Sequence, residues 1–589
     1  MNIFGFLSLL GGLALFLYGM NVMGGGLEKV SGGKLERILE RLTSNPLKAV
    51  LLGAGVTAVI QSSSATTVML VGFVNSGIMK LSQAIGIIMG ANIGTTATSW
   101  LLSLTGIESD NFFISMLKPT SFSPILAVIG VIMIMSKKSD RRKDVGEILI
   151  GFAVLMFGME TMSSAVKPLA DVPEFTGILT KFSNPLLGVL AGAVLTAVIQ
   201  SSSASVGILQ ALSVTGAFTY GSVIPIIMGQ NIGTCVTAIL SAVGANKGAK
   251  RTACVHLYFN IIGSVLFLAL YMVLNAVFHF SFADETVGVA GIAAIHSIFN
   301  VFATLLLLPF TKGLEKLAYL TIPVDESELS RKGEEEEFKI LDSRFLATPN
   351  FAIEQCVTVT KQMAELTRDT LVTAKNLFTE YSEEAAEKVE KQENLIDKYD
   401  DKLSAYLTQL NSQNLSYRDS QMVSTLMHSI NDFERIADHA VNLMEIIRKM
   451  NKKEIEFSAK AQREMEIFGN AVEDILDRSV RAFVESDMEL ALTVEPLEEV
   501  IDDLNKEVKK RHIKRLRKGK CTIDLGLVLA DVAANYERVA DHCSNLAVYM
   551  IQMEDSSIEA HEYVNTLTEE IREQFEQMQE TYREKYQLS

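Results

Sequence analysis

A four-residue polar tract, Gln-Ser-Ser-Ser, occurs twice in this chain, at residues 61–64 and 200–203. Each copy lies within a long run of uncharged side chains, and residues 182–246 contain no Asp, Glu, Lys or Arg at all. Such a run is too long for one core helix of a soluble protein and long enough for more than one membrane crossing. Polar groups inside a bilayer need partners, so these tracts must line a cavity or bond to each other.

The two tracts belong to a larger internal repeat, in which matching positions keep one constant offset along the chain. Gln61 corresponds to Gln200, and the segment Asn-Ile-Gly-Thr at 92–95 returns at 231–234 with the same offset. Residues 12–99 and 151–238 are therefore two copies of one unit, aligned without a gap. A duplicated membrane unit with polar interruptions at matching places is typical of secondary transporters, whose binding site lies where the repeats meet.

Composition divides the chain into two unlike parts. Residues 1–330 carry 19 basic and 17 acidic side chains, whereas residues 331–589 carry 34 and 52, a net charge of −18. The first part is membrane-like, and the second is acidic, soluble and helix-rich. The negative charge argues against nucleic acid as a partner. The five cysteines show no C-x-x-C spacing, so we expect neither a disulfide framework nor a zinc site, and a reducing compartment fits.

The apolar pattern predicts seven membrane-spanning helices and two re-entrant hairpins. Residues 46–80 and 185–219 hold the polar tracts together with helix-breaking Pro and Gly, and we interpret each as a half-helix, a polar tip and a returning half-helix. The alternative is one ordinary spanning helix, whose serines bond to its own backbone. The N-terminus lacks the basic region of a cleaved signal peptide, so the first span is expected to be retained. The spans are expected at 3–23, 84–104, 120–136, 146–164, 222–243, 253–280 and 287–310.

Basic residues in short loops predict the orientation of these spans. Loops 137–143 and 247–251, and the loop that holds Lys29, should be cytoplasmic in the plasma (inner) membrane, with the N-terminus outside. Three spans separate the start of one repeat from the start of the next, and an odd number inverts the second copy. We therefore expect an axis in the membrane plane to relate the repeats, and the hairpin tips to meet near the bilayer midplane.

The region beyond the membrane part is predicted to be a cytoplasmic, all-α domain. We assign residues 1–320 to the membrane domain, 321–345 to a charged linker and 346–589 to long amphipathic helices. This last part also repeats, because Glu-Arg-Ile-Ala-Asp-His at 434–439 matches Glu-Arg-Val-Ala-Asp-His at 537–542. Two similar bundles of roughly three helices in tandem are therefore expected.

The polar tracts have the chemistry of a site for an anion together with cations. Ser, Thr, Asn and Gln offer donors and acceptors without charge. Backbone N–H groups at half-helix N-termini bind phosphate-like anions, and freed carbonyls with hydroxyl groups bind Na+. The alternative is that these small polar residues only let helices approach closely. For any single residue packing is the better reading, but four matched clusters favour a site.

The paired Gln-Ser-Ser-Ser and Asn-Ile-Gly-Thr motifs resemble those of the type II sodium-dependent phosphate cotransporters, over about residues 5–310. The resemblance implies an inverted-repeat Na+/phosphate symporter with its site at the two hairpins. It implies that phosphate contacts six residues, which are Gln61, Ser62, Ser63, Gln200, Ser201 and Ser202. It implies that Na+ contacts, or is surrounded by, six others, which are Ser64, Ser203, Asn92, Thr95, Asn231 and Thr234.

Pairs of carboxylates four residues apart mark the C-terminal helices, so each pair lies on one helix face. Such pairs repel unless a cation lies between them, and the alternative is an ordinary solvated acidic face. The repeated Glu-Arg-x-Ala-Asp-His motif resembles the PhoU family, over about residues 346–570, and this implies bound divalent or ferric metal. The sequence does not choose among Fe, Mn, Zn and Mg. The expected ligands are Glu393, Asp397, Glu434, Asp438, Glu498, Asp502, Glu537 and Asp541.

These observations lead to one hypothesis and two alternatives. We expect a Na+-coupled phosphate carrier with a PhoU-like regulatory domain, whose partners are phosphate and the lipid bilayer. The alternatives are a phosphate sensor without transport and a Na+-coupled carrier of another anion. A cytoplasmic regulatory protein and a homo-oligomer stay compatible with the sequence. No nucleophile–base pairing, P-loop or cofactor fingerprint is present, so we do not expect an enzyme.

Overall fold

The structure, a computed structural model, is helical and divides into two compact units. Unit 1 is Met1–Phe351 and unit 2 is Ala352–Ser589. Apart from one isolated bridge between Thr219 and Thr286, all regular secondary structure in the described residues is helical, which confirms the all-α prediction. The structure describes residues 3–31, 45–106, 119–136, 140–172, 184–324, 337–413, 415–554 and 569–588.

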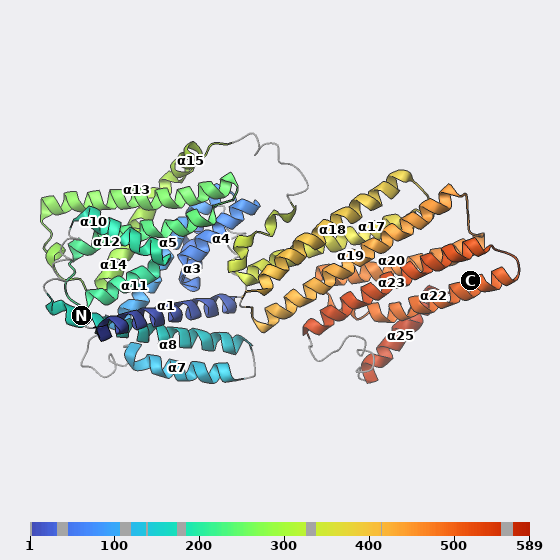
Figure 1. Ribbon diagram of the computed structural model, residues 1–589, viewed down its shortest axis with the longest axis horizontal. Helices are drawn as coiled ribbons and strands as arrows, with labels where there is room; N and C mark the ends of the chain where they lie inside the picture. The colour runs from blue at the N-terminus through green and yellow to red at the C-terminus, as the bar shows by residue number, and fades with distance from the viewer. Residues whose placement is uncertain are drawn as a thin grey trace. The chain divides into compact units, whose positions relative to one another are not determined.

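The helices of unit 1 account for the expected spans and for both hairpins. Among the described residues, six helices are long and apolar enough to cross a membrane, and the shorter apolar segment Ser121–Met135 corresponds to the third expected span. In chain order (Figure 1) they are α1 Ile3–Ser31, α3 Pro46–Ile60, α4 Ser63–Ser76, α5 Leu81–Ser103, α7 Pro119–Met135, α8 Asp140–Val166, α10 Pro185–Ile199, α11 Ser202–Ser213, α12 Tyr220–Ser241, α13 Lys247–Phe278, α14 Val289–Leu307 and α15 Thr311–Thr321.

Both polar tracts break a helix, as the hairpin interpretation predicts. Gln61 ends α3 with φ of 62°, and Gln200 ends α10 with φ of 60°, which is the left-handed conformation that terminates helices. The next helix then starts from a serine cap, since Ser62 Oγ accepts the amide of Ala65 and Ser201 Oγ accepts that of Ala204. The alternative of one continuous spanning helix is therefore wrong at both tracts.

Each hairpin packs on the helix that follows it through closely spaced small residues. Gly86, Gly90 and Gly94 repeat every four residues on α5, and a Cβ on Gly94 would lie 2.7 Å from the Cβ of Thr57 on α3. The second repeat keeps this contact, because a Cβ on Gly233 would lie 2.8 Å from that of Thr196. Glycine at these places lets two backbones touch, so each first half-helix is held against a full-length span.

The pairing of α1 with α8 supports the inversion of the second repeat. These helices are counterparts in the internal repeat, and they lie side by side (Figure 1). A Cβ on Gly12 would lie 3.0 Å from the carbonyl oxygen of Gly158, and one on Gly19 would lie 2.7 Å from that of Gly151. Gly12 and Gly151 are counterparts, as are Gly19 and Gly158, so the helices run antiparallel about a pseudo-two-fold axis perpendicular to both.

Several predicted cytoplasmic segments gather at one end of unit 1. Lys29 at the end of α1 forms an ion pair of 3.0 Å with Glu147 near the start of α8. The amide of Asn246 donates to Asn75 Oδ1 at the end of α4, over 2.9 Å. Lys247 Nζ bonds to the carbonyl oxygen of Pro323 after α15, over 3.4 Å. Residues 137–139 of the basic loop, and the rest of the loop after α1, lie outside the described residues.

Unit 2 is built from long amphipathic helices that form two related bundles, as expected. The axis of this second repeat lies between α19 and α23: His439 Nδ1 lies 2.8 Å from Asn535 Oδ1, and His542 Nδ1 lies 2.7 Å from Asp432 Oδ1. The two contacts are counterparts, because the repeated motif aligns His439 with His542 and Asp432 with Asn535. The helices (Figure 1) are α17 Pro349–Asn376, α18 Glu383–Asn411, α19 Tyr417–Lys452, α20 Ala459–Glu485, α21 Met488–Ala491, α22 Val494–Arg517, α23 Ile523–Glu554 and α25 Glu569–Lys585.

We predict that Gly19→Ala destabilises unit 1 through the α1–α8 contact. The added methyl group would lie 2.7 Å from the carbonyl oxygen of Gly151, and overpacking of this kind costs about 1–3 kcal/mol. The matched control is Gly25→Ala on the same helix, where nothing lies within 4 Å of the added Cβ. Thermal unfolding in detergent should show a lower Tm for the first variant only. Equal Tm values would contradict the close packing of α1 on α8.

Candidate functional site

The candidate site is the meeting point of the two hairpin tips. Ser64 Oγ, in the first turn of α4, donates to the carbonyl oxygen of Gln200, which caps α10, over 3.3 Å. A residue of the first hairpin thus bonds to the cap of the second across 136 positions of sequence. The structure therefore brings the two predicted phosphate-binding tracts together.

Thr98, a polar residue on α5 and outside both hairpins, also connects the two tips. Thr98 Oγ1 on α5 donates to Gln61 Oε1 over 2.8 Å, and Ser203 Oγ lies 3.5 Å from the same Thr98 oxygen. Thr98 is only 1% exposed, so its contact with Ser203 is buried and its bond to Gln61 is partly buried. The Gln61 amide nitrogen also bonds to the carbonyl oxygen of Ala58 in its own helix, which fixes the orientation of the Gln61 side chain.

Four helix ends converge at this place. The first-turn N–H groups of α4 and α11 have no acceptor in their own helix, and the last carbonyls of α3 and α10 have no donor in theirs. N-termini carry partial positive charge and C-termini carry partial negative charge. The contact from Ser64 to Gln200 therefore brings the N-terminus of α4 beside the C-terminus of α10. Thr98 links the N-terminus of α11 to the C-terminus of α3 in the same way. Anion and cation sites can be neighbours in this arrangement without a charged side chain.

The predicted phosphate residues all lie at these helix ends. Gln61 and Gln200 are the C-caps, and Ser62 and Ser201 are N-caps whose hydroxyl oxygens accept backbone amides over 3.1 and 3.2 Å. Those two hydroxyl groups keep their protons free to donate, since they act as acceptors in the cap. Ser63 and Ser202, both buried, supply the next N–H groups. Their binding of phosphate stays a prediction.

The Asn-Ile-Gly-Thr residues lie deeper, among the packed helices. Thr95 and Thr234 are buried, and each donates its hydroxyl proton to the backbone four residues earlier, at 3.0 and 2.9 Å. Asn231 donates in the same way to Ile227, whereas Asn92 donates to Asn260 of α13 over 2.9 Å. Threonine oxygens that donate their proton to the backbone retain lone pairs for a cation. A role in Na+ binding stays a prediction, because the hydrogen bonds that these four side chains donate within the described part of the chain do not reach the tips.

Thr98 was not among the residues expected from the sequence, although the sequence contains a signal for it. The repeated motif extends to Asn-Ile-Gly-Thr-x-x-Thr, because Thr237 is the counterpart of Thr98 in the second copy. Thr98 and Thr95 are three residues apart on α5, so they share a helix face. Thr57 and Thr66 were also missed, and their hydroxyl groups bond over 3.0 Å between the two halves of the first hairpin.

Comparison with known proteins decides the family. A family model described as Na+/Pi-cotransporter matches residues 15–164 and again residues 154–296. YqeW of Bacillus subtilis, a protein described as uncharacterized, is 31% identical over 312 residues, which are 53% of this chain and 96% of YqeW. The chain belongs to the Na+/Pi-cotransporter family. The resemblance expected from the paired motifs is confirmed, and the double match agrees with the internal repeat.

Further members of this family have names that refer to phosphate. YjbB of Escherichia coli K12, named as a candidate inorganic phosphate export protein, is 28% identical over 366 residues, which are 61% of this chain and 63% of YjbB. The rat sodium-dependent phosphate transport protein 2A is 37% identical over 99 residues, 16% of this chain and 15% of that protein. Because six helices in the described part of the chain are long and apolar enough to span a bilayer, this family member is a membrane protein of the transporter type.

The C-terminal unit carries a second family match. A model described as PhoU domain matches residues 360–447 and 465–550, which confirms the predicted resemblance and its duplication. A PhoU homologue of Thermotoga maritima is 28% identical over 174 residues, 29% of this chain and 74% of that protein. The PhoU crystal structure from Pseudomonas aeruginosa aligns with a TM-score of 0.33 and 19% identity, covering 36% of this chain and 99% of that one.

Several of the predicted metal ligands lie near one another on helices of unit 2. Burial, and then Asp397 and Asp438, raises the pKa of Glu393. Burial, and then Asp438, raises the pKa of both Asp397 and Glu434. In the second bundle, burial followed by carboxylate neighbours raises the pKa of Glu498 to about 8. These groups therefore lie near enough to repel one another, which is the arrangement that a bound cation would relieve.

Arginines of the same motif supply part of the positive charge that would offset the repulsion between these carboxylates. Arg435 Nη1 lies 3.6 Å from Asp438, and Arg538 Nη1 lies 3.6 Å from Asp541. Within the described residues, no three His, Cys, Asp or Glu side chains are grouped so that they could hold a metal ion. The oxygen donors are of the type that a hard divalent or ferric ion prefers, but side-chain movement would be needed. The metal ligands named from the sequence stay a prediction.

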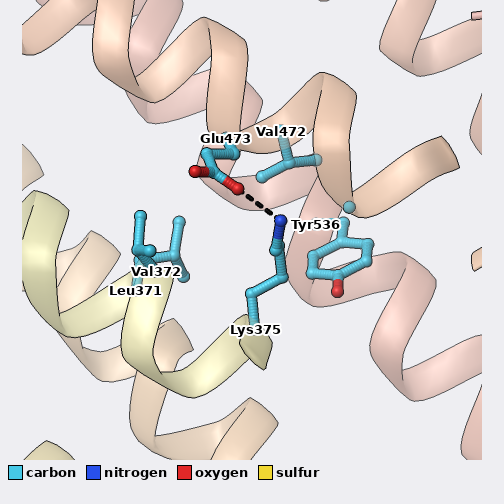
Figure 2. A pocket seen from close by; sticks show the side chains of 7 residues that line it. Leu371, Val372, Lys375, Val472, Glu473 and Tyr536 are labelled. Carbon is cyan, nitrogen blue, oxygen red and sulfur yellow. Dashed lines mark hydrogen bonds and ion pairs between the residues drawn. The ribbon is translucent and has the colours of Figure 1, made fainter. Parts of the chain in front are cut away.

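A separate pocket of unit 2 contains one lysine, and its charge is already neutralised. Figure 2 shows Lys375 of α17 reaching between Glu473 of α20 and the ring of Tyr536 on α23. Lys375 Nζ forms an ion pair with Glu473, and it donates to Asn470 Oδ1 over 2.9 Å. A carboxylate in contact with the only cation that lines this pocket disfavours an anion there. This pocket is therefore not a candidate phosphate site.

We predict that the Glu498 carboxyl group makes unit 2 lose stability as pH rises. Its pKa is about 8 in the folded unit and near 4.5 when unfolded, so the folded state binds more protons between these values and stability falls across that window. Glu498→Gln should flatten this fall when Tm is measured from pH 5 to 8 in chelator. A change of about 1 kcal/mol moves the Tm of a unit of this size by about 2–4 °C.

The control for this titration is the exposed neighbour Glu499, replaced by Gln. Glu499→Gln makes the same charge change at an exposed position and should keep the wild-type decline of Tm with pH. If both variants decline as the wild type does, the half-buried carboxyl group of Glu498 does not govern the pH dependence of unit 2.

Proposed function

We propose that this protein is a secondary carrier that couples the movement of inorganic phosphate across the plasma membrane to Na+. The main observation behind this proposal is that the two hairpin tips meet, because Ser64 of one contacts Gln200 of the other. Membership of the Na+/Pi-cotransporter family and the phosphate-related names of relatives support the same substrate. The binding groups are uncharged, which suits an anion that must be released in every cycle.

The uncharged site also explains why a cation should accompany phosphate. Moving a bare anion into a low-dielectric site is costly unless an opposite charge or many hydrogen bonds compensate for lost hydration. The tips supply amide and hydroxyl donors, and the caps Gln61 and Gln200 contain no positive charge. Na+ bound by carbonyl oxygens at the C-terminal ends of α3 and α10 would supply the missing charge next to phosphate. Binding of either ion then favours binding of the other.

The inverted repeats provide a route for alternating access. Because α1 and α8 pair about a pseudo-two-fold axis, exchanging the conformations of the two repeats would turn a site open to one side into a site open to the other. The direction of net transport then follows the gradients of Na+ and phosphate. Uptake and the export named for YjbB are both compatible with this arrangement.

Unit 2 is proposed to be a cytoplasmic regulatory domain. Its helices match the PhoU domain twice, and the segment that enters it leaves unit 1 at the end where Lys29, Lys247 and Glu147 lie. Its acidic surface and carboxylate clusters suit metal ions and a protein partner. All residues proposed to contact phosphate belong to unit 1, so translocation itself is assigned to that unit.

We predict that Thr98→Val lowers Na+-driven phosphate transport by tenfold or more. The substitution keeps the shape of the side chain but leaves Gln61 Oε1 without its buried donor, which costs about 1–3 kcal/mol. Gln61→Ala and Gln200→Ala should abolish transport. The measurement is uptake of labelled phosphate into proteoliposomes, with and without an inward Na+ gradient.

The control for these variants is Thr161→Val on α8. Its hydroxyl group is exposed and, among the residues that the structure describes, bonds to the carbonyl oxygen of Phe157 in the same helix alone, so transport should stay near the wild-type rate. Wild-type uptake that ignores the Na+ gradient would refute the coupling. Full transport by Gln61→Ala and Gln200→Ala would refute the assignment of the hairpin tips.

We predict that opposite ends of unit 1 react differently with membrane-impermeant thiol reagents in intact cells. Lys250→Cys lies at the end predicted to be cytoplasmic and should resist labelling, whereas Asp284→Cys lies at the other end and should react. Both side chains are exposed in the structure, and both variants need a background without the five native cysteines. Labelling of Lys250→Cys from outside would overturn the orientation.

A further inference from the structure

The segment just before unit 2 is docked on one hairpin of unit 1. This anchor segment, residues 337–351, includes the first residues of α17, which begins at Pro349. Its Phe345 and Phe351 contact Phe73 of α4, with ring centroids 5.5 and 5.1 Å apart, and the two rings are 4.9 Å from each other. All three rings are fully buried. The half-helix that begins at Ser62 is thus held at its other end by an aromatic cluster.

A buried polar network holds the same segment in place. Asp342 forms an ion pair of 2.7 Å with Arg344 and accepts from Asn75 Nδ2 of α4 over 2.6 Å. Arg344 Nε donates to the carbonyl oxygen of Ser241, at the end of α12, over 2.7 Å. Asp342 is 6% exposed, so this charge depends on its partners. The anchor segment therefore bridges α4 of the first repeat and α12 of the second.

The two repeats differ at the positions that receive the anchor segment. Gly72, Phe73 and Asn75 of α4 correspond to Ala211 and Leu212 of α11 and to Val214, its C-cap. A Cβ on Gly72 would lie 2.6 Å from the ring of Phe345, so glycine is what lets the ring approach. Val214, the counterpart of Asn75, is 43% exposed. In an otherwise closely matched pair of hairpins, the first alone has the residues that fit this segment.

We propose that the anchor segment positions the first hairpin, so that displacement of α17 acts on the phosphate site through α4. The inference rests on the proposed function, since it concerns how that site is held. α4 is one rigid helix from the cap Ser62 to Ser76, so fixing its C-terminal end also fixes the N-terminal turn that contains Ser63 and Ser64. Release of the anchor lowers the order of these binding groups and weakens phosphate binding.

The test uses the full-length protein in lipid and two variants that release the segment in different ways. Gly72→Ala forces the Phe345 ring away, and Phe345→Ala removes the ring. Gly55→Ala on α3 is the matched control, because nothing lies within 4 Å of its added Cβ. Hydrogen exchange followed by mass spectrometry reports the mobility of α4 and of α11 separately.

We expect both release variants to speed exchange in α4 by about threefold or more, while α11 changes little. Their KM for phosphate should rise by about threefold or more with a nearly unchanged maximal rate, as for lost positioning in a bound state. Gly55→Ala should match the wild type. The double variant should be no worse than Phe345→Ala alone, because the methyl group then has no ring to displace.

Three outcomes would overturn the inference: unchanged exchange in α4, equal acceleration in α11, or an unchanged KM despite a mobile α4. Failure of the proposed function looks different. In that case wild-type vesicles carry no phosphate at all, while faster exchange confined to α4 still supports the docking of the segment. Purified variants that elute as single species in detergent exclude misfolding as the cause.

Discussion

The cost of ending a helix inside a membrane governs the rest of unit 1. At each tip, backbone N–H and C=O groups lose their helical partners in a medium without water, and each unsatisfied group costs several kcal/mol. The chain meets this cost with serine caps at Ser62 and Ser201, and with contacts between hairpins through Ser64 and Thr98. Groups that remain without partners are what a substrate can use. The backbone groups that make a helix end costly inside a membrane are therefore also the groups that suit the tips to the binding role proposed for them.

Such tips exist only because the surrounding helices hold them rigidly. Glycines on α5 and α12 bring these spans against the first half-helices at backbone contact, as for Gly94 at Thr57 and Gly233 at Thr196. Without a hydrophobic driving force between helices in lipid, close van der Waals packing is the main source of this association. The small residues on the spans thus hold in place the hairpins that contain the polar residues, and both sets recur at matching positions of the second copy.

The sequence predicted those parts of the architecture that the internal repeat determines. The duplicated tracts predicted broken helices, and the odd number of spans predicted the inversion that the pairing of Gly12 with Gly158 supports. The role of Thr98 did not follow, because its partners come from both hairpins and only the folded chain shows which helix faces the tips. The docking of Phe345 on Phe73 was equally hidden, since the sequence marked this region only as the end of a charged linker. Contacts between segments far apart in sequence leave no periodic signal to read.

The near-symmetry of the repeats makes their few differences informative. If the repeats were identical, the states open to the two sides would have nearly equal energy, because each would be the other with the repeats exchanged. A contact made by one repeat alone removes this balance, and a ligand or domain that shifts that contact shifts the populations by its difference in affinity. Asn75 and Gly72 contact the anchor segment, and among the described residues Val214 and Ala211 have no equivalent contact with it. Control of a symmetric carrier therefore requires an asymmetric attachment, and the segment leading into the PhoU-like unit supplies one.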